Sequence, residues 1–268
     1  MNVRDLEFSK LSAAGNDFIL FDNRSSNFAG DESDIFHRIC KRRIAVGADG
    51  ILLLEKSDDH DFSMRYYNAD GSLGEMCGNG ARAAAYYAYM NGIASGSMKF
   101  DVLGVVYKAR VMDEGIELGM PPPVKFEMKP GVNDMVNLQE GAYLDVGVPH
   151  YVLFAEDIDR LNVIDIGRFY RYHDSFQPKG VNVNFVQIID EHNLRIRTYE
   201  RGVEDETLAC GTGTISSAMT AFTQHGIRPP VHVETRGGHL IVSFKSDFQD
   251  LTLTGPAKIV YKGKIIDI

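Results

Sequence analysis

The chain has few cysteines and none of the common cofactor-binding patterns. Its three cysteines are an odd number in 268 residues, which does not suggest a disulfide framework. Neither a Cys-x-x-Cys pair nor a Cys/His cluster occurs, so a zinc site is not expected. A Gly-x-Gly-x-x-Gly motif after a strand, a Walker loop and a lysine suited to a pyridoxal phosphate Schiff base are also missing. We therefore expect chemistry that needs no cofactor and no metal.

Clustered positive charge and long apolar runs are absent as well. The chain has 28 Lys and Arg residues against 37 Asp and Glu residues, a net charge of −9, without a basic run. Nucleic acid and anionic membranes are therefore not expected partners. No stretch approaches the roughly 18 apolar residues of a membrane span. Residues 1–5 show no basic segment followed by an apolar run, so we expect a soluble cytoplasmic protein.

One tetrapeptide pattern, Cys-Gly-x-Gly, is present twice. It occurs at residues 77–80 and 210–213, and 210 − 77 = 133 residues is close to half the chain. The spacing predicts a duplication with two domains, and a site that takes one thiol from each half.

Each copy opens a short apolar stretch with the pattern of a helix. Residues 81–91 precede Gly92, and residues 214–225 precede Gly226, as expected where helices end. Cys77 and Cys210 would then lie at helix N-termini, where unpaired N–H groups bind anions and lower the pKa of a thiol. Such an arrangement suits removal of a proton from one face of a carbon and delivery to the other. A lone free cysteine is more often a small buried hydrophobe, but the repetition favours a catalytic pair.

Short runs rich in β-branched and aromatic residues recur along the chain and outnumber the helical stretches. The two cysteine helices are apolar on nearly all sides, which suits helices enclosed by curved sheets. Further helices are predicted at residues 34–42 and 166–172. Pro121–Pro123 is the best candidate for the crossing between the halves.

Polar residues follow strands near both motifs. Asn68 comes before the first motif, and Glu200 and Arg201 come before the second, where they could recognise the carboxylate and ammonium groups of an amino acid. Turn formation by Asn68 and a surface ion pair between Glu200 and Arg201 are equally open readings. Asn16 lies in another polar turn, and His150 follows a strand and could adjust the pKa of a thiol. We assign no role to Cys40.

These residues, taken together, resemble the diaminopimelate epimerase family. The matching stretches follow the order of the family over nearly the whole chain: residues 15–18, 46–50, 68–72, 77–82, 149–150, 181–185, 199–202 and 209–213. The two cysteine motifs combined with Gly-Asn-Asp-Phe and Glu-Arg-Gly are highly specific, whereas each alone would be weak.

The resemblance implies a fold of two pseudo-symmetric α/β domains, each a strongly curved mixed β-sheet or barrel wrapped around a central α-helix. The N-terminal epimerase domain would span residues 1–115 with a returning C-terminal strand at 257–268, and the C-terminal domain would span 116–256. The site would lie between the domains, and the enzyme would be a homodimer.

The implied reaction is the cofactor-independent interconversion of LL- and meso-2,6-diaminopimelate, in lysine and peptidoglycan precursor biosynthesis. By motif matching, Cys77 and Cys210 are the acid and base, and His150 and Glu200 adjust their pKa values. Tyr261 matches a tyrosine of the dimer contact. The residues expected to bind the substrate are Asn16, Asn68, Gly78, Asn79, Asn182, Glu200, Arg201, Gly211 and Thr212.

Two positions depart from the family pattern. Val148 stands where members often carry Asn or another small polar residue, and Gly50 stands where some carry Gln, so two possible hydrogen bonds to the distal end of the substrate are lost. A different amino-acid racemase on the same scaffold therefore stays an alternative. A thiol-redox protein is a second alternative, although redox pairs favour Cys-x-x-Cys spacing.

Overall fold

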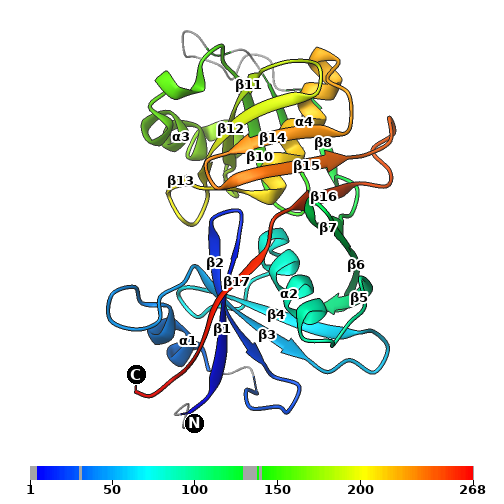
Figure 1. Cartoon of the computed structure of the whole chain (residues 1–268). Helices are drawn as coiled ribbons and strands as arrows, with labels where there is room; N and C mark the ends of the chain where they lie inside the picture. Colours follow the sequence, from blue (N-terminus) through cyan, green and yellow to red (C-terminus); the bar gives the residue numbers. More distant parts are fainter. Residues whose placement is uncertain (1–4, 30–31, 129–137, 139–140, 268) are drawn as a thin grey trace. The chain divides into compact units, whose positions relative to one another are not determined.

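The computed structural model describes residues 5–29, 32–128, 138 and 141–267. The chain divides into two compact units, which are described separately below. Unit 1 comprises residues 1–118 and 255–268, and unit 2 comprises residues 119–254. Each unit contains a mixed β-sheet and two α-helices in its described residues (Figure 1). No helix of the described residues is long and apolar enough to cross a membrane.

Unit 1 is built on a sheet with the strand order β17-β1-β2-β3-β4-β5-β6-β7. The pairs β2–β3 and β4–β5 are parallel and the others antiparallel, and helices α1 and α2 make the two parallel connections. The C-terminal strand β17 lies against β1, as the red and blue strands in Figure 1 show. The elements are β1 (Glu7–Ala13), β2 (Asn16–Asp22), α1 (Ser33–Cys40), β3 (Gly50–Glu55), β4 (Phe62–Asn68), α2 (Gly78–Met90), β5 (Ser97–Val102), β6 (Val105–Met112), β7 (Gly115–Gly119) and β17 (Lys258–Lys264).

Unit 2 has the strand order β8-β9-β10-β11-β12-β14-β15-β16, with β13 added beside β12. Here β10–β11 and β12–β14 are parallel, and α3 and α4 lie in the connections. The elements are β8 (Lys125–Met128), β9 (Ala142–Asp145), β10 (Pro149–Phe154), η1 (Ile158–Arg160), α3 (Val163–Arg171), η2 (Asp174–Phe176), β11 (Asn182–Ile188), β12 (Asn193–Glu200), β13 (Asp205–Thr207), α4 (Gly211–His225), β14 (Val231–Thr235), β15 (Gly238–Ser243) and β16 (Thr252–Gly255).

The two units repeat the same topology. From β17 to β7 in unit 1 and from β8 to β16 in unit 2, antiparallel and parallel strand pairs follow in the same order. In both units, the helices lie in the connections between the parallel strands. Helices α2 and α4 each contact most strands of their own sheet. The predicted fold class, two pseudo-symmetric units of a curved mixed sheet around a central helix, is confirmed.

The central helices are buried because small side chains let the sheets approach them closely. Helix α2 buries five alanines, and α4 buries several serines and threonines. The hydroxyls of Thr214, Ser217 and Thr220 donate to carbonyls four residues earlier at 2.8 Å, so these three buried hydroxyls each have a hydrogen-bond partner. On each sheet a second core lies beneath the outer helix. Phe36 of α1 and Tyr170 of α3 are fully buried there.

Candidate active site

Both cysteines occupy the N-cap positions predicted for them. Cys77 precedes α2 with φ −113° and ψ 109°, and its sulfur accepts a hydrogen bond from Gly80 N at 3.4 Å. Cys210 precedes α4 with φ −115° and ψ 114°, and its sulfur accepts from Gly213 N at the same distance. Each sulfur therefore lies at the positive end of a helix, which favours the thiolate.

Asn16 and Asn79 surround the first thiol. The Oδ1 atom of Asn16, at the start of β2, lies 4.0 Å from Cys77 Sγ and accepts from Asn79 Nδ2 at 3.3 Å. Asn79 Oδ1 in turn accepts from Arg82 Nη2 at 2.7 Å. The structure therefore places Asn16 and Asn79 beside Cys77. It adds Arg82, which is not among the predicted site residues, as a neighbour of Asn79.

Arg82 is completely buried on α2, beside the first motif. Within the described part of the chain it donates to Asn79 Oδ1 and to Gly78 O, and its Nε has no hydrogen-bond partner. Burial lowers the pKa of its guanidinium to about 10, and the nearby Cys77 opposes this shift. Arg82 stays charged at neutral pH and favours a negative charge on Cys77.

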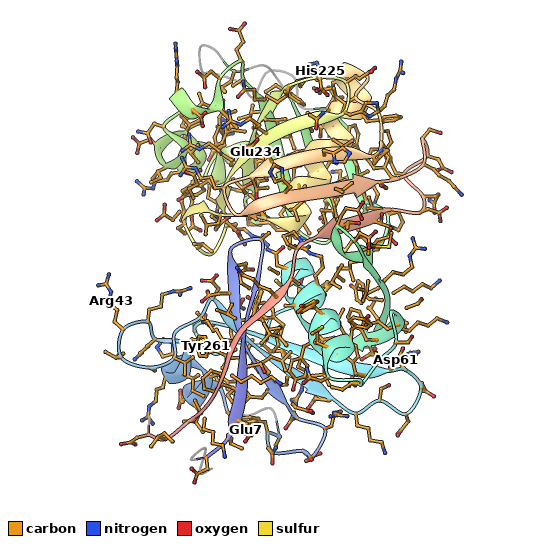
Figure 2. All side chains as sticks on the ribbon, viewed as in Figure 1. Glu7, Arg43, Asp61, His225, Glu234 and Tyr261 are labelled. Carbon is orange, nitrogen blue, oxygen red and sulfur yellow. The ribbon has the colours of Figure 1, made fainter. Side chains whose placement is uncertain are left out.

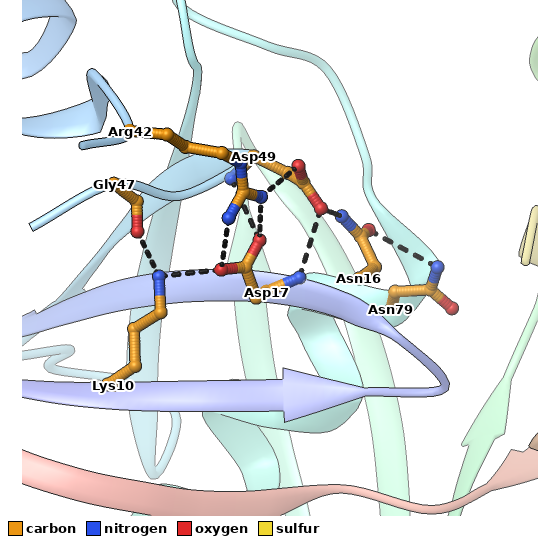
Figure 3. Close-up of polar contacts among 7 residues, drawn as sticks. All are labelled: Lys10, Asn16, Asp17, Arg42, Gly47, Asp49 and Asn79. Atoms are coloured by element: carbon orange, nitrogen blue, oxygen red, sulfur yellow. Dashed lines mark hydrogen bonds and ion pairs between the residues drawn. The ribbon is translucent and has the colours of Figure 1, made fainter. Parts of the chain in front are cut away.

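The Asn16 side chain is bonded to a network of ion pairs, which Figure 3 shows. Asn16 Nδ2 donates to Asp49 Oδ2 at 2.7 Å, and Asp49 Oδ1 pairs with Arg42 at 2.7 Å. Arg42 and Lys10 both pair with Asp17. Although burial opposes ionisation of Asp17, the hydrogen bonds from Arg42 and Lys10 outweigh it and lower the pKa of this carboxyl. The network holds the Asn16 amide so that its oxygen faces Cys77.

Asn68 ends β4 and closes a turn. Its backbone N–H donates to Ser72 O at 2.9 Å, and its Nδ2 donates to Ser72 Oγ at 3.1 Å. At Gly50 an added Cβ would lie 2.5 Å from the ring of Tyr66. The Tyr66 ring and the Tyr67 carbonyl oxygen therefore occupy the space that a larger side chain at position 50 would need.

His150 and Thr212 adjoin the second thiol. Thr212 Oγ1 lies 3.5 Å from Cys210 Sγ and 2.9 Å from His150 Nε2. His150 is completely buried on β10, and this burial, together with the charge of Arg201, lowers the pKa of its imidazole to about 3. The ring is therefore neutral at physiological pH, and Thr212 lies between it and the Cys210 sulfur.

Asn182, Glu200 and Arg201 lie at strand ends in unit 2. Asn182 donates from Nδ2 to Pro149 O at 3.0 Å and accepts from Arg201 N at 2.8 Å, so it joins β10 to the end of β12. Arg201 Nη1 donates to Lys179 O at 3.1 Å. Glu200 is the last residue of β12, as Asn68 is the last residue of β4.

Two further residues contact His150 or its neighbours and were not among the predicted site residues. Asn184 Nδ2 lies 3.0 Å from His150 Nδ1, and Thr198 Oγ1 donates to Asn184 Oδ1 at 3.0 Å. Asn184 lies in residues 181–185, one of the stretches that match the family, and this position could have indicated a role in the site. Thr198 carries no signal in the sequence, because it is one threonine among several in a strand.

Tyr261 and Cys40 lie elsewhere in unit 1. Tyr261 of β17, labelled in Figure 2, is 46% exposed. Its ring packs edge-on against that of Phe8, with ring centroids 6.0 Å apart. Cys40 is buried on α1, and burial raises the pKa of its thiol to about 12, which makes it unreactive.

The model of the family described as "Diaminopimelate epimerase" matches residues 8–128 and 142–260. The chain belongs to the diaminopimelate epimerase family. It is 39% identical to the diaminopimelate epimerase of Aquifex aeolicus over 273 residues, covering 97% of this chain and 98% of the relative. It is 40% identical to that of Chlorobaculum tepidum over 264 residues, covering 95% and 99%.

Solved structures of lower identity share the fold. A phenazine biosynthesis protein of the PhzF family from Bacillus anthracis has a TM-score of 0.78 at 14% identity, covering 98% of this chain and all of the other. A probable proline racemase from Agrobacterium radiobacter has a TM-score of 0.68 at 13% identity, covering 97% and 92%. At these identities the likeness concerns the fold.

Proposed function

We propose that Cys77 and Cys210 are the acid and base of the reaction of this family, the interconversion of LL- and meso-2,6-diaminopimelate. Inversion at a carbon needs one group to remove a proton from one face and another to deliver a proton to the opposite face. The observation that carries the proposal is the identical N-cap geometry of the two thiols, each of which accepts a hydrogen bond from a glycine N–H at 3.4 Å. The reaction supplies meso-diaminopimelate for lysine and peptidoglycan precursor synthesis.

The first turns of the two helices are proposed to bind the reacting carboxylate. Backbone N–H groups at a helix N-terminus have no partner within the helix, and glycines let a ligand come close. In this role we place Gly78, Asn79, Gly211 and Thr212. No cofactor or metal is needed, because the two thiols complete the proton transfer.

The remaining polar residues are proposed to bind the distal amino-acid end. Arg201 uses one guanidinium N–H group for Lys179 O, and a guanidinium has five such groups, so it can also pair with the distal carboxylate. Asn16, Asn68, Asn182 and Glu200 complete the recognition, and Glu200 and His150 also adjust the thiol pKa values. Val148 and Gly50 offer no amide to the substrate.

Single cysteine variants test this proposal. We expect Cys77→Ala and Cys210→Ala each to abolish epimerisation of LL-diaminopimelate, because one thiol cannot serve both faces. Cys40→Ala is the matched control, since its thiol is buried with a pKa of about 12, and it should keep full turnover. Near-normal turnover in either of the first two variants would exclude the two-thiol mechanism.

We also propose that the two compact units are the two epimerase domains, and that the protein forms a cytoplasmic homodimer. Free thiols at Cys40, Cys77 and Cys210 suit a reducing compartment. The exposure of Tyr261 on β17 supports a contact there between two copies of the chain. Tyr261→Lys should then sediment as a monomer, and an unchanged dimer would place the contact elsewhere.

A further inference from the structure

We infer that Asn184 and Thr198 are positioning residues that hold His150 as the tautomer protonated on Nε2, so that the Thr212 hydroxyl donates its hydrogen bond to the Cys210 sulfur. The inference rests on the role proposed for Cys210. Asn184 and Thr198 thereby join the residues of the site, and the buried His150 orients the Thr212 hydroxyl.

The direction of the chain of hydrogen bonds starts at Thr198. Its hydroxyl donates to Asn184 Oδ1 at 3.0 Å, which turns the Nδ2 group of that amide toward His150 Nδ1, also at 3.0 Å. Thr198 is 2% exposed and Asn184 is fully buried, so water does not compete for these groups. Because an amide nitrogen can only donate, Nδ1 of the imidazole must accept.

The neutral imidazole carries its proton on one of its two ring nitrogens, and Nδ1 is excluded because it accepts a hydrogen bond. The proton therefore lies on Nε2, which donates to Thr212 Oγ1 at 2.9 Å. Because Thr212 Oγ1 accepts this hydrogen bond, its own proton is free to point to Cys210 Sγ, which lies 3.5 Å away. The four hydrogen bonds from Thr198 to the sulfur therefore run in one direction, and each joins one donor to one acceptor.

The glycine after Thr212 makes room for this arrangement. A Cβ at position 213 would lie 2.3 Å from Asn184 Oδ1, so the amide can occupy its place only beside glycine. The second glycine of the motif therefore serves the positioning of Asn184 as well as the approach of a ligand.

The two copies of the motif differ in their third residue, and the contacts explain the difference. In the first copy, Asn79 bonds Asn16 and Arg82, and the sulfur of Cys77 faces the accepting oxygen of Asn16. In the second copy, the hydroxyl of Thr212 donates directly to the sulfur. A donor to sulfur favours the thiolate, so Thr212 lowers the pKa of Cys210 relative to a chain without this hydroxyl.

The described residues of unit 2 place charged and titratable groups near this relay. His150 on β10 is neutral at physiological pH because its pKa is about 3, and Arg201, which follows β12, contributes to this lowering. Glu200 ends β12. The N-terminus of α4 adds the N–H of Gly213 at the sulfur. The effect of the Thr212 hydroxyl is therefore measured against a constant charge on His150.

Nuclear magnetic resonance of the full-length protein without substrate tests the inference. The ¹⁵N signals of the His150 ring should show a protonated Nε2 and a bare Nδ1, and Thr198→Val should add a population with the proton on Nδ1. The ¹³Cβ signal of Cys210 should titrate about one pH unit higher in Thr212→Val than in the wild type. Thr212→Ser should restore the wild-type value, and Cys77 should titrate alike in all three proteins.

The inference is overturned if the wild-type His150 ring carries its proton on Nδ1, or if Cys210 titrates identically in Thr212→Val. An unchanged tautomer in Thr198→Val overturns the role of Thr198 and Asn184. None of these measurements uses turnover, whereas the proposed function fails on the activity of Cys77→Ala and Cys210→Ala. The two failures are therefore distinguishable.

Discussion

Among single residues, Arg82 has an environment that stability alone does not explain. A buried charge costs several kcal/mol unless it is well paired, yet the described contacts of this guanidinium are an amide and a carbonyl oxygen. Both acceptors belong to the first cysteine motif. We interpret Arg82 as a residue whose burial serves the orientation of Asn79 and the charge on Cys77.

Replacement of this charge should separate activity from stability. We expect Arg82→Met to unfold in urea with a free energy within about 1 kcal/mol of the wild type, since a buried charge is exchanged for an apolar chain of similar size. Its kcat/KM should fall by roughly tenfold to a hundredfold, because a hydrogen bond from a charged donor is lost at Asn79.

Arg42→Met is the matched control for Arg82→Met. It removes a charge that pairs with both Asp17 and Asp49, so it should lower the free energy of unfolding more than Arg82→Met does. If Arg82→Met kept full activity, or lost several kcal/mol of stability, Arg82 would be a structural residue only.

Among the elements, the two central helices begin with the same motif but differ in the space around its second glycine. A Cβ at Gly213 would meet Asn184 Oδ1 at 2.3 Å, whereas a Cβ at Gly80 would meet the flexible end of Leu52 at 3.0 Å. Equivalent positions in the two units therefore tolerate an added methyl group differently.

Alanine at these glycines makes a matched pair. We expect Gly213→Ala to lower the free energy of unfolding by about 1–3 kcal/mol, because Asn184 must leave its place beside His150. Gly80→Ala should cost less, since a leucine methyl can move by a few tenths of an ångström. Equal losses in chemical denaturation would show that Asn184 is not held as tightly as the contacts indicate.

Patterns of local origin allowed the helices and motifs to be predicted, and long-range contacts decided the rest. Both central helices were predicted with their N-cap cysteines, although they begin three residues earlier than the apolar stretches. Strand β1 has a weak signal in the sequence, because Ser9 and Lys10 interrupt its apolar pattern. Lys10 is nevertheless buried, since Asp17 on the neighbouring strand neutralises it. Strands β8 and β13 are four and three residues long, too short for a periodic pattern to indicate them.

In the site, too, residues in local motifs could be predicted, whereas residues brought there by long-range contacts could not. Cys77, Cys210, Asn16 and Asn79 stand in motifs, and the structure brings Asn16 and Asn79 to Cys77. Thr198 reaches the site only through the pairing of β11 with β12, which places it opposite Asn184. A single sequence carries no direct record of such a cross-strand pair.

For the whole molecule, the buried neutral His150 should make stability depend on pH. The pKa of this histidine is about 3 in the folded chain and about 6.5 when exposed in the unfolded chain. Between these values the unfolded chain binds more protons, so the free energy of unfolding falls as the pH falls, by at most about 1.4 kcal/mol per pH unit.

Urea denaturation between pH 7.5 and pH 5 measures this dependence. His150→Gln should show a shallower fall in the free energy of unfolding than the wild type. His232→Gln, which alters an exposed histidine, should keep the wild-type slope. Equal slopes in the wild type and His150→Gln would mean that His150 is protonated in the folded chain as readily as in the unfolded one.

The two-thiol mechanism is tested most directly by following hydrogen isotopes in deuterated water. When LL-diaminopimelate is converted in the early part of the reaction, one thiol should remove the original proton, and the other should deliver a deuteron to the inverted carbon of the meso product. The LL-diaminopimelate that remains should keep its original hydrogen, because the thiol that takes the proton is not the one that delivers the deuteron. Deuterium appearing in the remaining LL-diaminopimelate as fast as in the meso product would contradict the account, since it would show one group acting on both faces.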